Sequence, residues 1–190
     1  MAAKVAAPSP EALARSAYGP ATGVMTDEDG LIPIEWLQIG HHVVTHEGLA
    51  GVLWTGTTPV FDLAEGGDSV VIAPDALGDA SPGVPVTVGP KHLVLVRHPG
   101  VVLHFAEEAV FVEARDLLGI NGITRARPAS GAIFVHVVLE RPVLIETQGL
   151  WSSTLDPQGD VAKVPVLHEG EAAVLRDVLA REWAEQRQSA

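Results

Sequence analysis

Two histidines inside apolar segments are the side chains best placed for chemistry in this sequence. His92 follows a turn at Gly89-Pro90-Lys91 within VTVGPKHLVLV, and His136 lies within AIFVHVVLE. An imidazole is the side chain best matched to proton transfer near neutral pH. The same pattern also fits a structural histidine at the edge of a sheet. Both a catalytic and a structural role are therefore open for His92 and His136.

The other six histidines are expected in turns or on the surface: His41, His42, His46, His98, His104 and His168. His42 and His46 fall on a segment with the pattern of a strand, where helical metal-ligand spacing does not apply. The chain has no cysteine, which removes disulfides, thiolate metal sites and a cysteine nucleophile. The sequence predicts no bound metal and no cofactor.

Neighbouring residues assemble no familiar catalytic motif. The sequence lacks G-x-S-x-G, the dinucleotide-binding G-x-G-x-x-G and a Walker loop. Its serines fall in predicted tails and loops: Ser9, Ser16, Ser69, Ser81, Ser130, Ser152, Ser153 and Ser189. Adjacent acids in EDG (28–30) and in EE (107–108) are expected to be solvated. The residues alone therefore define no enzyme class.

Many short strands have to position these side chains. The chain has 190 residues, of which 47% are hydrophobic, and it contains 19 Gly and 14 Pro. Short segments with the composition of strands recur between Gly, Pro or Asp: TPVFDLA, SVVIAP, VPVTVG, HLVLVRH and VVLHFA. Because no long helices separate them, an all-β fold is predicted.

The C-terminal segment is expected to form an amphipathic helix. Apolar residues recur there at helical spacing: Leu167, Val174, Leu175, Val178, Leu179 and Trp183. We expect the helix to pack on the sheet with Trp183 as its anchor. The predicted division of the chain is a flexible tail over 1–17, a β domain over 18–160, and a linker with the helix over 161–190.

The net charge of −12 argues against a nucleic-acid partner. Only Arg125 and Arg127 form a close basic pair, whereas binding to a phosphate backbone needs several cations on one face. The chain shows no signal peptide and no run of the roughly 20 apolar residues that a membrane span needs. We expect a cytoplasmic monomer or weak dimer with an unknown protein partner and no membrane partner. Secretion by a leaderless route stays open.

Five segments follow one another in a specific order: DGLIPIEWLQIGHHVVTHEG, GVLWTG, SVVIAPDALGDASPGVPVTVGPKHLVLV, AVFVEARDLLGINGI and IFVHVVLERPVLIETQGL. Their order and register resemble the Hint (Hedgehog/intein) domain, in its bacterial Hint_2-like branch, over roughly residues 18–155. The resemblance implies a compact all-β horseshoe of short strands in a pseudo-twofold arrangement, whose ends meet at one site.

The resemblance also implies a reaction. In the Hint family, a Cys, Ser or Thr at the first position of the domain attacks the preceding carbonyl. A His three residues after a Thr or Ser helps to protonate the departing amide nitrogen. The thioester or ester is then resolved by water, a sterol or another nucleophile. By this resemblance His92 and His136 occupy inherited catalytic positions.

Several matching positions depart from the family pattern. Gly89 stands where a Thr or Ser should precede the histidine, so that hydroxyl is missing. Gly40-His41 replaces Gly-Asp, and Arg141-Pro142 replaces Arg-His. These changes put the catalytic apparatus in doubt while leaving the fold pattern intact.

The nucleophile position falls near Tyr18 or Gly19, and neither residue can attack in that role. Ser16 or Thr22 takes the place only if the register shifts by a few residues. A missing nucleophile would abolish the reaction, because it supplies the atom that forms the new bond.

Three functions are therefore open. The first is a degenerate Hint domain that does not cleave itself and acts as a scaffold or interaction module. The second is an autoprocessing domain that uses Ser16 or Thr22 in an N-to-O acyl shift and releases residues 1–15 or 1–21. The third is a ligand or metal site at the point where His92 and His136 are expected to converge, near the open end of the strands.

Overall fold

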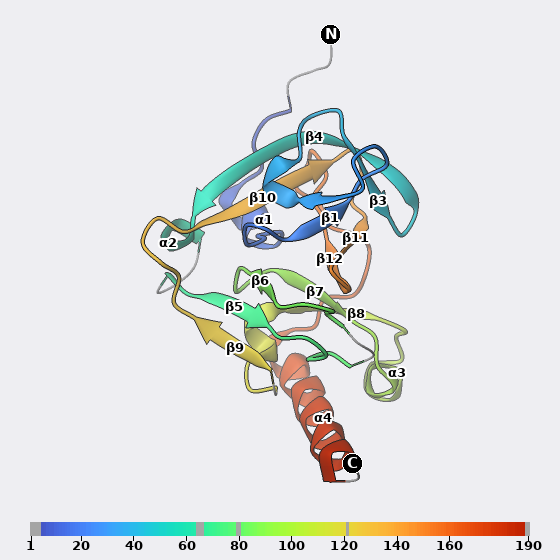
Figure 1. Cartoon of the computed structure of the whole chain (residues 1–190). Helices are drawn as coiled ribbons and strands as arrows, with labels where there is room; N and C mark the ends of the chain where they lie inside the picture. Colours follow the sequence, from blue (N-terminus) through green and yellow to red (C-terminus); the bar gives the residue numbers. More distant parts are fainter. Residues whose placement is uncertain (1–4, 64–66, 79–80, 121, 189–190) are drawn as a thin grey trace.

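The chain folds into antiparallel sheets with a long C-terminal helix, as a computed structural model describes it (Figure 1). The structure describes residues 5–63, 67–78, 81–120 and 122–188, with side chains described as far as residue 181. The largest sheet has seven strands in the order β10 (Ile133–Leu139), β4 (Gly48–Pro59), β3 (His42–Thr45), β11 (Leu144–Thr147), β12 (Leu150–Ser153), β7 (Leu93–Val96) and β8 (Val110–Glu113). The predicted all-β class is confirmed.

Two smaller sheets complete the domain. One has three strands in the order β6 (Val86–Val88), β5 (Ser69–Ile72) and β9 (Ile123–Ala126). The other is the hairpin of β1 (Gly23–Met25) and β2 (Leu31–Pro33). Short helices connect the strands: α1 (Pro10–Ala14), η1 (Ile34–Trp36), α2 (Val60–Leu63), α3 (Pro99–Phe105) and η3 (Ala114–Leu117).

The long strand β4 joins two pairings. Its first residues pair with β3, from Thr45 opposite Gly48 to His42 opposite Gly51, and its later residues pair with β10 as far as Ile133 opposite Pro59. The register shifts between Val138 and Leu139 of β10, which marks a bulge. Figure 1 shows β4 and β10 curving together over one end of the molecule, with α1 beneath them.

The same backbone motif occurs in both halves of the domain. β2 leads into η1, which ends at Leu37 with φ −60° and ψ 136°. β8 leads into η3, which ends at Leu118 with the same two angles. This repetition of strand and 3₁₀ turn accords with the pseudo-twofold arrangement that the resemblance implied.

Two main apolar cores lie on either side of the N-terminal segment. One contains Val43, Val52, Val135 and Ile145 from β3, β4, β10 and β11, together with Tyr18. The other contains strand residues of β5 to β9 together with residues of α3, η3 and the C-terminal helix. The chain around Tyr18 therefore lies where the two halves meet.

The C-terminal helix α4 runs from Glu169 to Gln188 and extends away from the sheets (Figure 1). Leu175 and Leu179 are buried in the core that also holds Val101 of α3 and Leu117 of η3. Val174 is 45% exposed, so it does not share the buried face. The predicted anchoring by Trp183 lies outside the described side chains. No described helix is both long and apolar enough to cross a membrane.

Residues 13–17 are packed against the domain, whereas the sequence predicted a flexible tail over 1–17. Ser9 caps α1, because its Oγ accepts a hydrogen bond from Ala12 N at 3.2 Å. Leu13 packs with Val138 and Leu155. A segment rich in Ala, Pro and Ser has the composition of a tail, and only these long-range contacts order it.

Candidate active site around Ser16

Backbone hydrogen bonds hold residues 15–19 between β10 and the turn that carries His92. Tyr18 exchanges two hydrogen bonds with Val135 of β10, at 3.0 and 2.8 Å. On the other side, Gly89 N donates to the carbonyl of Ala17 at 2.9 Å, and Leu93 N donates to the carbonyl of Arg15 at 3.0 Å. The Arg15–Ser16 peptide bond is therefore fixed inside the domain.

Ser16 is fully buried at this point. Its Oγ makes no hydrogen bond of good geometry within the described part of the chain, although it lies close enough to the Tyr18 hydroxyl to lower the pKa of that group. Its carbonyl oxygen accepts a hydrogen bond from Nδ1 of His136 at 3.0 Å. A carbonyl can only accept, so Nδ1 of His136 carries a hydrogen, and a neutral His136 keeps a free lone pair on Nε2. Burial lowers the pKa of His136, which favours this neutral form.

His92 is also fully buried, and neither ring nitrogen makes a well-formed hydrogen bond to a described residue. Burial lowers the pKa of His92 to about 3, the nearby His136 lowers it further, and the carbonyl of Ala17 acts in the opposite direction. The ring of Tyr18 lies edge-on to that of His92, with ring centroids 4.6 Å apart. His92 is therefore a neutral imidazole near pH 7, held in place by an aromatic neighbour.

Tyr18 anchors the site to β12. Its hydroxyl donates to the carbonyl of Ser153 at 3.0 Å and lies 3.1 Å from Oγ of Ser152. Burial raises the pKa of Tyr18 to about 12, while the hydroxyls of Ser152 and Ser16 act in the opposite direction. Tyr18 is thus a neutral hydrogen-bonding residue at physiological pH. Sequence reasoning did not find the contribution of Ser152, because no local pattern links it to Tyr18.

The two candidate nucleophiles differ in their surroundings. The Thr22 hydroxyl donates to the carbonyl of Gly19 at 2.7 Å. No contact joins Thr22 to His92 or His136 in the part of the chain that is described. The Ser16 hydroxyl, by contrast, makes no hydrogen bond of good geometry, and the carbonyl of Ser16 binds His136. Ser16, and not Thr22, is therefore in contact with one of the two histidines, His136, in the described part of the chain.

Gly89 fits closely against the segment that carries Ser16. A Cβ atom added at Gly89 would lie 2.8 Å from Cβ of Ala17, which is closer than real Cβ contacts come. The glycine lets the turn before His92 approach the Ser16 segment, and Gly89 N donates to Ala17. This close approach leaves no room for a side chain at position 89, which accounts for the absence of a hydroxyl there.

Replacing Gly89 with serine is expected to destabilise the folded chain. The added Cβ would force Gly89 and Ala17 apart, and overpacking of this kind costs about 1–3 kcal/mol. Urea unfolding measures the loss. The double variant Gly89→Ser with Ala17→Gly removes the opposing Cβ and should recover part of it. Equal stability of Gly89→Ser and the wild type would contradict the steric explanation.

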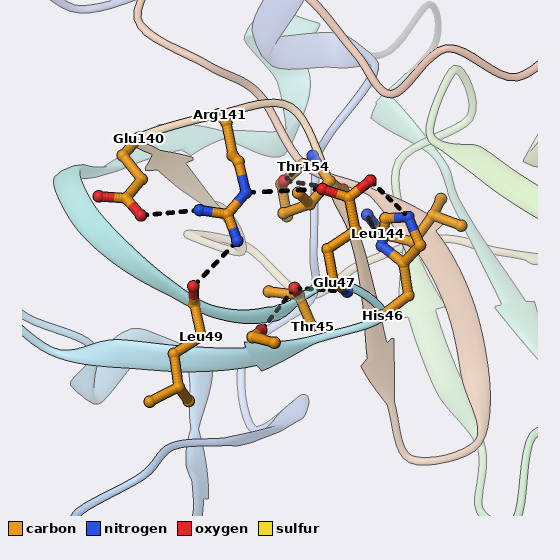
Figure 2. A network of polar contacts seen from close by, with 10 residues as sticks. Thr45, His46, Glu47, Leu49, Glu140, Arg141, Leu144 and Thr154 are labelled. Atoms are coloured by element: carbon orange, nitrogen blue, oxygen red, sulfur yellow. Dashed lines mark hydrogen bonds and ion pairs between the residues drawn. The ribbon is translucent and has the colours of Figure 1, made fainter.

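Arg141 and His46 lie in a polar network near the β3–β4 turn (Figure 2). Arg141 contacts Glu140 at 2.9 Å and Glu47 at 3.6 Å, and it donates to the carbonyl of Leu49 at 3.0 Å. His46 lies 3.4 Å from the carboxylate of Glu47. Arg141 belongs to the Arg141-Pro142 pair that replaces the family's Arg-His. Its contacts stabilise the β3–β4 hairpin.

The remaining sequence candidates are dispersed. Nδ1 of His41 accepts from Gln38 N at 3.4 Å, and His42 lies 3.8 Å from Asp27. His98 caps α3 by accepting from Gly100 N at 3.0 Å. His104, His168 and the acids at 28–29 and 107–108 are exposed. Among the described residues, no group of three or more His, Asp or Glu is placed to hold a metal ion.

Fold and site together define a class: an all-β domain that encloses residues 15–19, with two buried histidines nearby, one of which binds the Ser16 carbonyl. The family model of the Hint domain (Hint_2) matches residues 16–159. The chain therefore belongs to the Hint domain family, and the resemblance inferred from the sequence is confirmed. The match begins at Ser16.

Several solved structures are similar to this chain. The crystal structure of gp41-1 intein shares 14% identity over 72% of this chain and 97% of that chain, with a TM-score of 0.45. The AceL NrdHF class 3 split intein shares 13% over 73% and 97%, with a TM-score of 0.46. The solution structure of a bacterial intein-like domain from Clostridium thermocellum shares 16% over 72% and 97%, with a TM-score of 0.47. No curated protein matches the sequence.

Proposed function

We propose that this Hint domain processes itself at the Arg15–Ser16 bond through an N-to-O acyl shift. The observation that carries the proposal is the Ser16 hydroxyl, which is buried, makes no hydrogen bond of good geometry among the described residues, and lies next to a carbonyl that is held in place. A buried polar group without a partner costs about 1–3 kcal/mol. A role in attack on the neighbouring carbonyl would explain why the chain buries the Ser16 hydroxyl despite this cost.

In the shift, Oγ of Ser16 bonds to the carbonyl carbon of Arg15 while the C–N bond between the two residues breaks. The hydroxyl proton passes to a neutral imidazole and is then returned to the Ser16 nitrogen, which leaves as a free amine. The product is an ester between Arg15 and the Ser16 side chain, with no net gain of protons or electrons. Water then hydrolyses the ester and releases residues 1–15.

Two groups support the acyl shift. His92, the histidine that the family pattern assigns to proton transfer, is neutral near pH 7 because burial lowers its pKa to about 3. It is therefore in the form that accepts a proton, although a pKa of about 3 makes it a weaker base than an ordinary histidine. Leu93 N donates to the Arg15 carbonyl oxygen at 3.0 Å, and that donor would stabilise the negative charge formed on the oxygen during attack.

The mass of the intact chain tests the proposal. We expect the purified chain to convert with time into residues 1–15 and 16–190, with Ser16 as the new N-terminus. Ser16→Ala should stay full-length. Thr22→Ala should be cleaved like the wild type, because the Thr22 hydroxyl is bound to Gly19. A wild-type chain that stays full-length even with hydroxylamine, which cleaves esters, would contradict the proposal.

A degenerate interaction module is the second candidate, and an exposed apolar row favours it. Leu31 pairs with Met25, and Val44 pairs with Leu49. The bridge between Thr26 and Val43 places Met25 beside Val44, so the four side chains cross β2, β1, β3 and β4. They are 41% to 60% exposed. A contiguous exposed apolar surface is typical of a protein-binding site. A full-length chain in the mass experiment would favour this function.

A further inference from the structure

A small cavity with three cationic side chains lies behind the turn that carries His92. It has a volume of about 240 Å³, and its lining includes Lys91, Arg115 and Arg125. The cations come from the β6–β7 turn, from η3 and from β9, which are far apart in the sequence. Val70 and Leu118 supply apolar wall on the same cavity. Asp68 also lines the cavity, so it combines an apolar part with a charged part in which three cations face one carboxylate.

The positive charge of the cavity is only partly neutralised. Arg125 pairs with Asp68 at 3.3 Å, and Arg115 pairs with Glu113 at 2.7 Å. Lys91 is half-buried and makes no ion pair or hydrogen bond with any described residue. Its ammonium group is therefore available to a ligand. Each arginine also has further N–H groups beyond those in its ion pair.

This local charge contrasts with the rest of the protein. The chain has a net charge of −12, with 12 Lys and Arg residues in total. Four of those cations gather here, since Arg127 also reaches Asp68 at 4.0 Å. Acidic surroundings repel long polyanions, whereas a cationic concavity with apolar walls attracts a small anion that can enter it. The small volume likewise fits a small molecule.

We infer that this cavity binds a small carboxylate that carries a short apolar tail. The carboxylate would lie against Lys91, Arg115 and Arg125, because guanidinium and ammonium groups form strong charge-assisted hydrogen bonds with carboxylates. The tail would lie against Val70 and Leu118, where its burial adds favourable free energy. Inorganic phosphate carries at least as much negative charge but has no tail, so we expect it to bind more weakly only if burial of the tail outweighs the extra charge.

The cavity adjoins the Ser16 site without belonging to it. Arg115 N donates to the carbonyl of Pro90 at 2.8 Å, and Ala114 N donates to the carbonyl of His92 at 2.9 Å. The bound anion would thus contact the outer side of the turn whose inner side carries the His92 ring. Binding does not depend on self-cleavage, and its test does not require cleavage.

Calorimetric titration of the full chain with hexanoate, acetate and inorganic phosphate tests the assignment at constant ionic strength, with chloride as the reference anion. We expect hexanoate to bind at least tenfold more tightly than acetate or phosphate. Lys91→Met should weaken hexanoate binding at least tenfold. Lys163→Met makes the same change of charge at an exposed lysine outside the cavity and should leave binding unchanged.

Two outcomes would overturn the inference. One is hexanoate binding no tighter than chloride, and the other is equal hexanoate affinity in Lys91→Met and the wild type. Tighter binding of phosphate than of hexanoate would overturn the assignment of a tailed carboxylate. If Lys91→Met fails to fold, the site is tested on the ¹⁵N-labelled wild type instead, by the changes in its amide chemical shifts when hexanoate is added. Hexanoate must shift the signals of Lys91, Arg115 and Arg125, and shifts confined elsewhere would contradict the site.

Discussion

Replacing His92 with glutamine should slow self-cleavage at Arg15–Ser16 by about 10²–10⁴-fold, the range that a positioned acid–base group contributes. Glutamine has a size similar to histidine but cannot accept the Ser16 proton and return it to the amide nitrogen. The rate is measured from the intact mass of the chain over time. Ser16→Ala is the negative control: it lacks the attacking oxygen and should not be cleaved.

A histidine outside the site provides the matched control for His92→Gln. His46 lies in the surface network with Glu47, so His46→Gln should cleave at the wild-type rate. His136→Gln should also slow cleavage, because it loses the Nδ1 hydrogen bond to the Ser16 carbonyl. Cleavage of His92→Gln at the wild-type rate would exclude His92 from the proton transfer.

Acid should destabilise the folded chain through the same histidine. The pKa of His92 is about 3 in the folded chain and about 6.5 in an unfolded one. Between these values the unfolded chain binds more protons, so stability falls as the pH falls below 6.5. At pH 5 the loss from His92 is about 2 kcal/mol relative to pH 7. The lowered pKa of His136 acts in the same direction.

Comparison of two variants isolates this contribution from that of the carboxylates. Urea unfolding of the full-length Ser16→Ala chain is measured at pH 7 and pH 5, with and without His92→Gln. The variant with glutamine should lose about 2 kcal/mol less over this interval. His168→Gln removes an exposed histidine and should not change the pH dependence. Equal acid sensitivity with and without His92 would contradict its burial as a neutral group.

The acid prediction and the cleavage prediction share one physical cause. The site buries two imidazoles and a hydroxyl with few hydrogen-bond partners, which makes it costly for stability. The same burial keeps His92 neutral near pH 7, and only a neutral imidazole can accept the proton of Ser16. Ser16→Ala should therefore stop cleavage without the loss of stability that is usual for a core substitution.

Local patterns in the sequence were sufficient for the fold class and for the two histidines. Alternating apolar residues between glycine and proline turns predicted the strands, and helical spacing near Leu175 predicted α4. The polar rings of His92 and His136 stood out within apolar strands. These features depend on short-range preferences, which the sequence displays directly.

The sequence was misleading about the segment before the strands. Residues 1–17 have the composition of a tail, yet Leu13 and Ser16 are buried. From the sequence, Gly89 was interpreted as the loss of a catalytic hydroxyl, because the family pattern has a Thr or Ser there. Its close approach to Ala17 gives a steric reason that no alternation of residues reveals. The burial of residues 13–17 and the steric role of Gly89 both depend on how segments distant in the sequence pack together, which only the tertiary structure shows.

The sequence by itself determined an acidic all-β chain with a C-terminal helix, the Hint family, and two candidate histidines. Only the tertiary structure placed Ser16, rather than Thr22, in contact with one of them, His136. It also brought Lys91, Arg115 and Arg125 to one cavity, where the sequence showed only the neighbouring Arg125 and Arg127. The physical reason is that strand pairing between distant segments sets these positions. For example, the hydrogen bond from Leu93 N to the Arg15 carbonyl fixes the position of Ser16. It joins two residues that no local sequence pattern connects.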